Sequence, residues 1–313
     1  MKEITYDAST KMYRGFPKLR KLGAVSPNGE ASPFVWKGRI MRLELEDESR
    51  GVDCSYPTHA IIRDRETGQI LSRFGEGCYY YSFYMEDDTA YVLGTKCLPG
   101  SHDGDTILIY ESRDLIHWSQ PRVLLSHPGW TYCNTSLTKG PQGYAILMEA
   151  ASPREELGVP FTFFFATSPD LVNWTFLGRE QSYNPYRYNG GPWMHYHAGW
   201  YYVISVTELP GPIYTNYISR TRDFTTWELG KYNPMLMPGE EDRVFSPLAF
   251  GFSPEREAEL ATGYLSSNSD VDMCELDGKT ILVYNVGNQL GFYYLAEAEY
   301  DGPMGELLER YFD

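Results

Sequence analysis

The chain contains the same seven-residue motif three times, and this repetition limits the folds that are open to it. The copies begin at Ser112, Ser168 and Thr221, and each has an aspartate two positions later and a tryptophan six positions later. The aspartates are 56 and then 53 residues apart. Self-similarity at this period indicates one supersecondary unit that is repeated along the chain.

Each motif follows a short run of β-branched and aromatic residues, which is typical of a strand. The runs are Thr106–Tyr110, Thr162–Ala166 and Ile213–Ile218. The short Asp side chain can accept hydrogen bonds from nearby backbone N–H groups, so the motif predicts a corner after each strand. The tryptophan then provides a large apolar side chain that can pack between neighbouring units. Three unrelated aspartate turns are the alternative, but agreement in residue class at four of the seven positions favours a repeat.

Five segments share a second pattern, in which an apolar stretch leads to a tight turn and then to another strand. Their first residues and turn residues are Glu30 and Gly38, Tyr81 and Thr89, Thr135 and Gly143, Gly191 and Gly199, and Asp270 and Gly278. The spacing is eight residues in every case, so the segments are equivalent parts of one repeat. Five four-stranded sheets of about 60 residues each would use the whole length, and closing them into a ring removes exposed sheet edges. We therefore expect an all-β fold, a five-bladed β-propeller that spans residues 1–313 as a single domain.

The composition allows a large core and excludes several classes of function. Of the 313 residues, 42% are hydrophobic and 15% are aromatic, which excludes a disordered chain. The formal net charge is −15 without a basic stripe, which argues against nucleic acid and against a membrane surface as partners. No apolar stretch approaches the length of about 18 residues that indicates a membrane-spanning helix. Helical patterns are confined to 254–260 and to a short C-terminal helix near 304–312.

The cysteines indicate the compartment in which the protein works. They are odd in number and scattered, without a Cys-x-x-Cys pair: Cys54, Cys78, Cys97, Cys133 and Cys274. Buried thiols in a reducing compartment therefore fit better than disulfides or a zinc site. The first residues also lack the apolar segment of a signal peptide. We expect a cytoplasmic protein.

The Ser-x-Asp-Leu-x-x-Trp corners and the five hairpins together resemble the five-bladed propeller glycosidases. This group includes the arabinanases and xylosidases of glycoside hydrolase family 43, the invertase and levansucrase relatives, and the anhydrogalactosidases of family 117. The resemblance covers almost the whole chain and implies a glycoside hydrolase with carboxylates at the axial starts of its innermost strands. By position, the resemblance makes Glu30 the catalytic base, although the family has Asp there.

The chain departs from the family 43 pattern at two further positions. Asn134-Thr135 stands where the family has an Asp on the third blade, and Gly190 stands where the acidic Glu of a Glu-Gly-Pro sequence is expected. The chain is therefore not an ordinary family 43 arabinosidase or xylosidase. Either another residue supplies the acid, as a His does in family 117, or catalysis is lost.

Glycoside hydrolysis needs a proton donor for the leaving oxygen and a carboxylate that activates water or attacks carbon. Glu30 and Asp270 hold the same repeat position on the first and fifth blades, which ring closure makes neighbours. Asp272 lies two residues further along and therefore on the same strand face as Asp270. We expect these acids to form a catalytic cluster near the axis. In the alternative, structural interpretation, Asp270 caps the turn at 268–270 and Glu30 belongs to the turn at 27–29.

Three residues are candidates for the general acid. Glu149 and Glu208 both end hydrophobic strands, where each either faces a pocket or simply reaches solvent. His195 lies four residues after Gly191 on the same strand face, and histidine is suited to proton transfer near neutral pH. The alternative for His195 is a hydrogen-bonded residue that is packed among aromatic side chains.

Sugar sites combine aromatic faces with a few polar groups in a concave pocket. The side chains predicted to bind substrate lie near inner strands or in the loops before them: Trp193, Tyr81, Trp130, Arg187, His59 and Glu76. Tyr79, Tyr80 and Tyr188 lie in the same stretches. Phosphate loops, zinc-binding His-Glu-x-x-His and Gly-x-Ser-x-Gly motifs are absent from the sequence, so no cofactor is expected. Acids that converge at an axis would also suit a calcium or magnesium ion.

The sequence thus predicts an exo-acting glycoside hydrolase for a short oligosaccharide or a glycoside. Exo action is inferred from the expected cytoplasmic location, where imported substrates are small. Two alternatives remain open. One is a carbohydrate-binding propeller without catalysis, and the other is a phosphorylase-like propeller that acts on mannosides and needs a cationic phosphate site.

Overall fold

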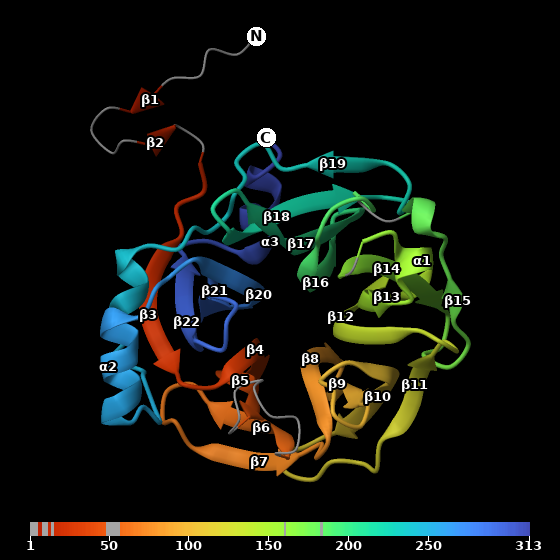
Figure 1. The fold of residues 1–313 in the computed structure, drawn as a ribbon, viewed down its shortest axis with the longest axis horizontal. Helices are drawn as coiled ribbons and strands as arrows, with labels where there is room; N and C mark the ends of the chain where they lie inside the picture. Colours follow the sequence, from red (N-terminus) through yellow and green to blue (C-terminus); the bar gives the residue numbers. More distant parts are fainter. Residues whose placement is uncertain (1–5, 8–11, 14–15, 48–56, 160, 182–183) are drawn as a thin grey trace.

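The protein is built from antiparallel four-stranded sheets that stand around a common axis (Figure 1). The structure is a computed structural model, which describes residues 6–7, 12–13, 16–47, 57–159, 161–181 and 184–313. The first sheet consists of β4 (Gly29–Trp36), β5 (Arg39–Asp47), β6 (Thr58–Asp64) and β7 (Ile70–Phe74). The second consists of β8 (Cys78–Glu86), β9 (Thr89–Cys97), β10 (Gly104–Ser112) and β11 (Arg122–Ser126).

The next two sheets repeat the same order. One consists of β12 (Thr131–Gly140), β13 (Gly143–Ser152), β14 (Thr162–Ser168) and β15 (Thr175–Phe176). The other consists of β16 (Gly190–His197), β17 (Trp200–Leu209), β18 (Ile213–Thr221) and β19 (Trp227–Leu229). In each of these four sheets the strand that comes first in the sequence is the innermost one, and the later strands follow outward (Figure 1).

The last sheet contains both ends of the repeat. Strands β20 (Ser267–Leu276), β21 (Lys279–Gly287) and β22 (Tyr293–Tyr300) pair in order, and β3 (Arg20–Ser26) then pairs with β22. Only Pro27 and Asn28 separate β3 from β4, so the N-terminal strand ties the last sheet to the first. Strand β4 consequently lies beside β20 (Figure 1). The expected proximity of the first and last units is confirmed.

A buried ion network holds this junction. Arg42 on β5 donates to Glu44 on the same strand at 2.9 Å and to Glu297 on β22 at 3.0 Å. Arg65 also binds Glu297, with its Nη2 2.8 Å from Oε2. Arg42, Glu44 and Glu297 have no solvent-exposed surface. The charges of the first and last sheets are therefore neutralised by each other rather than by water.

The three repeated motifs form the predicted corners between the third and fourth strands of their sheets. Oδ1 of Asp114 accepts hydrogen bonds from the N–H groups of Ile116 at 2.9 Å and His117 at 2.8 Å. Asp170 and Asp223 make the equivalent pairs of bonds. Trp118 stacks on Phe74 of the preceding sheet with ring centroids 4.0 Å apart, which confirms its role between units.

Helices are few and peripheral in the described part of the chain. The predicted helices are α2 (Pro254–Thr262), with Ser253 as its N-cap, and α3 (Met304–Arg310). A short helix that the sequence did not predict, α1 (Arg154–Leu157), follows β13. Strands β1 (Tyr6–Asp7) and β2 (Met12–Tyr13) pair with each other. None of the described helices is long and apolar enough to cross a membrane.

Candidate active site

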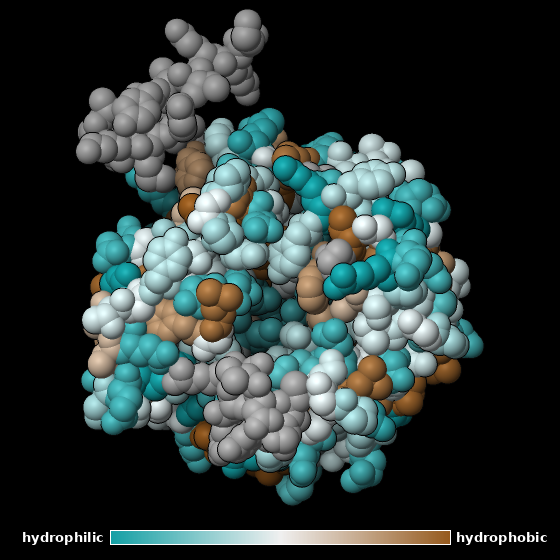
Figure 2. Space-filling model, in the orientation of Figure 1, coloured by the Kyte–Doolittle hydropathy of each residue, from teal (hydrophilic) through white to brown (hydrophobic). Residues whose placement is uncertain are grey.

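A cavity of about 600 Å³ opens at the centre of one face of the molecule. Figure 2 shows this hollow, whose interior is largely hydrophilic. Its walls come from the starts of the inner strands and from the ends of second strands and their loops. All the sheets thus contribute to one site on the axis.

Irregularities at the starts of the inner strands aim side chains into this cavity. Each inner strand shifts register against its partner near its start, for example between Gly29 and Ala31 and between Ser269 and Asp272. The residues within these bulges include Glu30 and Asp270, whose φ angles are 33° and 51°. A bulge of this kind redirects a side chain that a regular strand would place elsewhere.

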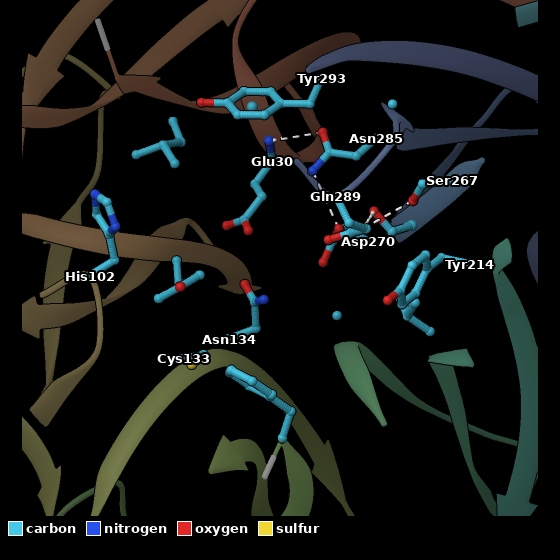
Figure 3. A pocket seen from close by; sticks show the side chains of 18 of the residues that line it. Glu30, His102, Cys133, Asn134, Tyr214, Ser267, Asp270, Asn285, Gln289 and Tyr293 are labelled. Atoms are coloured by element: carbon cyan, nitrogen blue, oxygen red, sulfur yellow. Dashed lines mark hydrogen bonds between the residues drawn. The ribbon is translucent and has the colours of Figure 1, made fainter. Parts of the chain in front are cut away.

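Glu30 and Asp270 line the same cavity, as the sequence predicts, and Asn285 lies between them (Figure 3). The Glu30 N–H donates to Oδ1 of Asn285 at 3.1 Å, and Nδ2 of Asn285 donates to Oδ2 of Asp270 at 3.3 Å. Oε2 of Glu30 is buried and has no hydrogen-bond partner among the described residues. An unpartnered carboxyl oxygen in a cavity leaves a position for a ligand hydroxyl or a water molecule.

Glu149 reaches the cavity from β13. Its Oε2 accepts hydrogen bonds from the Gly191 N–H at 3.1 Å and from Nδ2 of Asn134 at 3.2 Å. Both residues belong to inner strands, β16 and β12, so the carboxyl group is held between two sheets. Asn134 also lowers the pKa of Glu30, so it acts on both glutamates.

The carboxyl groups perturb one another. Burial, followed by the charges of Asp270 and Glu149, raises the pKa of Glu30 well above its ordinary value. Burial and the Asp270 charge raise the pKa of Glu149 to about 8, against the opposing hydrogen bonds from Asn134 and Gly191. Burial also raises the pKa of Asp270, while bonds with Ser269 and Asn285 lower it. Since an ionised carboxyl group raises the pKa values of its neighbours, the arrangement favours protonated carboxyl groups beside an ionised one.

Asp272 lies below this group, toward the interior of the ring. It lines a second, much smaller cavity together with Glu30 and Asp270, and it accepts a hydrogen bond from the Ser32 hydroxyl. Burial, followed by the Asp270 charge, raises the pKa of Asp272 to about 7, although the Ser32 bond opposes the shift. The second cavity measures about 20 Å³, which is enough for roughly one water molecule.

The wall of the main cavity is aromatic with a few amide and hydroxyl groups. The aromatic residues are Tyr79, Tyr80, Phe161, Tyr188, Tyr214, Phe292 and Tyr293. Gln289 donates to the hydroxyl oxygens of Ser267 at 3.0 Å and Ser269 at 3.3 Å. Among the described lining residues none is a lysine or an arginine. This combination of aromatic faces and neutral polar groups suits a sugar ring.

Several residues that the sequence singled out do not line the main cavity. Trp193 and Trp130 are buried in the cores between strands, where Trp130 packs edge-on against Phe164. Tyr81 is buried too; it borders the small cavity and donates from its hydroxyl to the Gly75 carbonyl at 2.5 Å. These aromatic residues provide packing, so their predicted contact with substrate is not supported by their positions.

The polar residues that the sequence singled out, other than the cavity acids, also lie outside the main cavity. His195 stacks on Trp193 with ring centroids 5.5 Å apart, and burial lowers its pKa to about 4. Glu208 and Arg187 are exposed. Glu76 is exposed and lies 4.0 Å from Nε2 of His59, which is also absent from the cavity lining. Of the acid candidates, only Glu149 lies in the main cavity.

Several lining residues near the ends of second strands were not predicted from the sequence. Asn285 lies near the end of β21, Gln289 follows that strand, Tyr293 is the first residue of β22, and Tyr214 lies near the start of β18. The available signal was the polar run Ser267–Asp270 at the start of β20, which marks the same end of the ring. The loops that bring Gln289 over the axis carry no comparable pattern.

The structure offers no metal cluster in its described part. No group of three or more His, Cys, Asp or Glu residues is arranged to hold an ion there. Cys78, Cys97, Cys133 and Cys274 form no disulfide with one another, and Cys54 lies outside the described residues. The raised pKa values of Glu30, Glu149, Asp270 and Asp272 indicate that protonation reduces the repulsion between these acids.

Solved structures of known proteins share this architecture. The catalytic domain of a family 62 α-L-arabinofuranosidase from Coprinopsis cinerea superimposes with a TM-score of 0.62 at 8% identity, covering 91% of this chain and 98% of that one. An α-L-arabinofuranosidase from Podospora anserina in complex with cellotriose superimposes with a TM-score of 0.60 at 8% identity, covering 92% of this chain and 98% of that one. A thermostable family 43 glycoside hydrolase superimposes with a TM-score of 0.59 at 10% identity, covering 91% of this chain and 93% of that one.

The fold is that of the β-propeller glycoside hydrolases. The resemblance inferred from the corners and hairpins is therefore confirmed at the level of the fold. No protein-family model matches the chain, and no curated protein matches it. At identities of 8–10% the propeller likeness leaves the chemistry to be argued from the site itself.

Proposed function

We propose that the protein is an exo-acting glycoside hydrolase, built as a single five-bladed β-propeller domain over residues 1–313. The five four-stranded sheets described above support the blade count. The observation that carries the function is the convergence of Glu30, Asp270 and Glu149 in one aromatic-walled cavity. Hydrolysis of a glycosidic bond needs one ionised and one protonated carboxyl group, and this site supplies both.

In the proposed reaction, the Glu30–Asp270 pair acts as the base or nucleophile. The pKa values of both carboxyl groups are raised, and the charge of Asp270 is among the causes for Glu30. In this proposal the two groups titrate as a coupled pair that carries one negative charge when it acts. That charge lies where it can activate a water molecule or attack the anomeric carbon. Asn285 fixes the orientation of the pair because it bonds to the backbone of one member and to the side chain of the other.

The shape of the cavity supports exo action on a short substrate. Its volume of about 600 Å³ lies within the range of small-ligand sites and suits one or two sugar rings. The cavity beneath it measures about 20 Å³ and admits nothing larger than water. A pocket that narrows in this way accepts the end of a glycan chain. Because two structural neighbours are arabinofuranosidases, arabinofuranosides belong among the first substrates to be tested.

The lining also bears on the two alternative functions. A phosphorylase needs a cationic group for phosphate, and the described lining contains neither lysine nor arginine. A binding protein without catalysis would need no protonated carboxyl group beside an ionised one, and burying such groups costs stability. Hydrolysis of neutral glycosides is therefore the better fit. No cofactor is part of this proposal. The four described cysteines are free thiols, which suits the proposed location in a reducing compartment such as the cytoplasm.

A screen of nitrophenyl glycosides with the purified full chain tests the proposal. The set should include pentofuranosides, pentopyranosides and hexopyranosides, each assayed with and without inorganic phosphate. Release of nitrophenol that does not depend on phosphate supports a hydrolase. Phosphate-dependent release would instead establish a phosphorylase, and sugar binding by calorimetry without turnover would establish a binding protein.

A further inference from the structure

We propose that Glu149 is the general acid of this site and that it delivers its proton from β13 into the space in front of Gly190. The inference rests on the proposed hydrolase function and adds the residue that protonates the leaving group. The sequence left the acid open among Glu149, Glu208 and His195. Its usual position in the resembling family is occupied by Gly190, which has no side chain.

The geometry shows how one residue takes the place of the other. A Cβ built on Gly190 would lie 2.6 Å from the Tyr188 hydroxyl oxygen and 3.1 Å from Oε1 of Glu149. The Glu149 carboxyl group therefore occupies the space that a side chain at position 190 would enter. Glycine at 190 therefore leaves room for two groups beside the cavity, the Tyr188 hydroxyl and the carboxyl group of Glu149 from the neighbouring sheet.

The hydrogen bonds of Glu149 also decide which oxygen carries the proton. The backbone N–H of Gly191 and the side-chain Nδ2–H of Asn134 both donate to Oε2. An oxygen that accepts two N–H bonds is not the hydroxyl oxygen of a protonated carboxyl group. The proton therefore belongs on Oε1, which makes no hydrogen bond among the described residues and lies beside Gly190. This arrangement presents a donor to a ligand rather than to the protein.

The surroundings keep this proton in place near neutral pH. The ionisable groups that influence Glu149 or are influenced by it include Asp270, Glu30, Asp103, Tyr80, Tyr188 and Cys133. All of them are acids, and the described lining provides no lysine or arginine to stabilise an ionised Glu149. Burial and the neighbouring acids therefore oppose loss of the proton, whereas the N–H donors of Asn134 and Gly191 favour it. His102 also lines the cavity, beside Tyr79.

The reaction balances with these groups. Oε1 gives its proton to the glycosidic oxygen as the bond to the anomeric carbon breaks, and the leaving group departs as an alcohol. Glu149 is then a carboxylate. Water supplies the hydroxyl group of the sugar product, and its proton passes to the Glu30–Asp270 pair in a single displacement or to Glu149 in a double displacement.

Leaving-group dependence tests this assignment in the full chain. A dinitrophenolate leaves without protonation, whereas phenol needs a proton, so loss of a general acid affects the phenyl glycoside selectively. We expect Glu149→Gln to lower kcat/KM about 100-fold or more on the phenyl glycoside and only a few-fold on the dinitrophenyl glycoside. Glu30→Gln and Asp270→Asn should lower kcat/KM on both substrates alike.

The controls separate this inference from the proposed function. Gln at 149 keeps an oxygen that accepts from Gly191 and Asn134, and Glu208→Gln removes an exposed carboxyl group outside the cavity and should leave both rates unchanged. Equal loss on both substrates with an unchanged melting temperature, or selective loss in Glu30→Gln instead, would overturn the assignment of Glu149 while leaving a hydrolase. A wild-type protein that cleaves none of the glycosides would overturn the proposed function itself.

Discussion

A Cβ on Gly191 would collide with the carboxylate of Asp270. The two residues lie in equivalent bulges on β16 and β20, and both have left-handed φ angles of about 50°. The absence of a side chain on one inner strand thus makes room for the catalytic candidate on the next. This relationship explains why one blade start is glycine while others hold Glu30 and Asp270.

Replacement of Gly191 by alanine tests this relationship. Gly191→Ala should lower kcat/KM by about 100-fold or more because a displacement of the order of 1 Å at a reacting group has that effect. Gly199→Ala is the matched control: Gly199 also has a positive φ, of 87°, but nothing lies within 4 Å of its Cβ position. Both variants should lose about 1 kcal/mol of stability from backbone strain, and only Gly191→Ala should lose activity. Equal activities in the two variants would refute the steric argument.

The activity of the wild-type protein should depend on pH with a basic limb set by Glu149. Because burial and the Asp270 charge raise the pKa of Glu149 to about 8, kcat/KM should fall as the pH rises through that value and the proton is lost. On the acidic side, activity should fall as the Glu30–Asp270 pair takes up a second proton. The pH profile of Glu149→Gln should lack the basic limb. Retention of that limb would show that another group titrates there.

Asp272 should make the folded protein less stable as the pH rises. Its pKa in the folded protein is about 7 against an ordinary value of 3.8, so the folded state binds more protons between these values. The stability that this proton provides is complete below about pH 4 and is lost as the pH rises through 7. Asp272→Asn should therefore show a smaller fall in melting temperature between pH 5 and pH 8 than the wild type. Asp88→Asn, at an exposed turn, should behave as the wild type; an identical fall in all three proteins would contradict the account.

The ring junction should depend on Arg42. Arg42→Met leaves the buried carboxylates of Glu44 and Glu297 short of positive charge, and removal of one partner from a buried pair costs about 3–5 kcal/mol. Arg20→Met breaks an ion pair to Glu299 in which the arginine side chain is 68% exposed, and it should cost about 1 kcal/mol or less. Urea denaturation of both variants measures the difference. A similar free energy of unfolding for the two would show that the network does not hold the junction.

The fold could be predicted from local chemistry that repeats. An aspartate that accepts two backbone N–H bonds at each corner needs only its immediate neighbours, so Asp114, Asp170 and Asp223 were recognisable in the sequence. The equivalence of Glu30 and Asp270 followed from the same spacing, and both residues line the cavity.

The rest of the site could not be predicted, because it depends on how far along its strand each residue lies from the cavity and on the bulges that redirect side chains. His195 shares a strand face with Gly191, but four residues correspond to about 13 Å along a strand, which places the ring below the cavity and against Trp193. Glu149 lies inside β13, opposite the register shift near the start of β12, and it accepts from the Gly191 N–H. Glu208 lies next to the end of β17 and is exposed. Gln289 and Tyr293 depend on the path of a loop, which single-residue patterns do not encode.

The most direct test of the account is the turnover of a cleavable aryl glycoside by Glu30→Gln and Asp270→Asn beside the wild type, with melting temperatures measured in the same buffer. We predict that each substitution lowers kcat at least about 100-fold and leaves the melting temperature unchanged or higher, since each removes a carboxyl group that is costly to bury. Full turnover by both variants would contradict the claim that carboxyl groups from the first and last sheets meet to break the glycosidic bond.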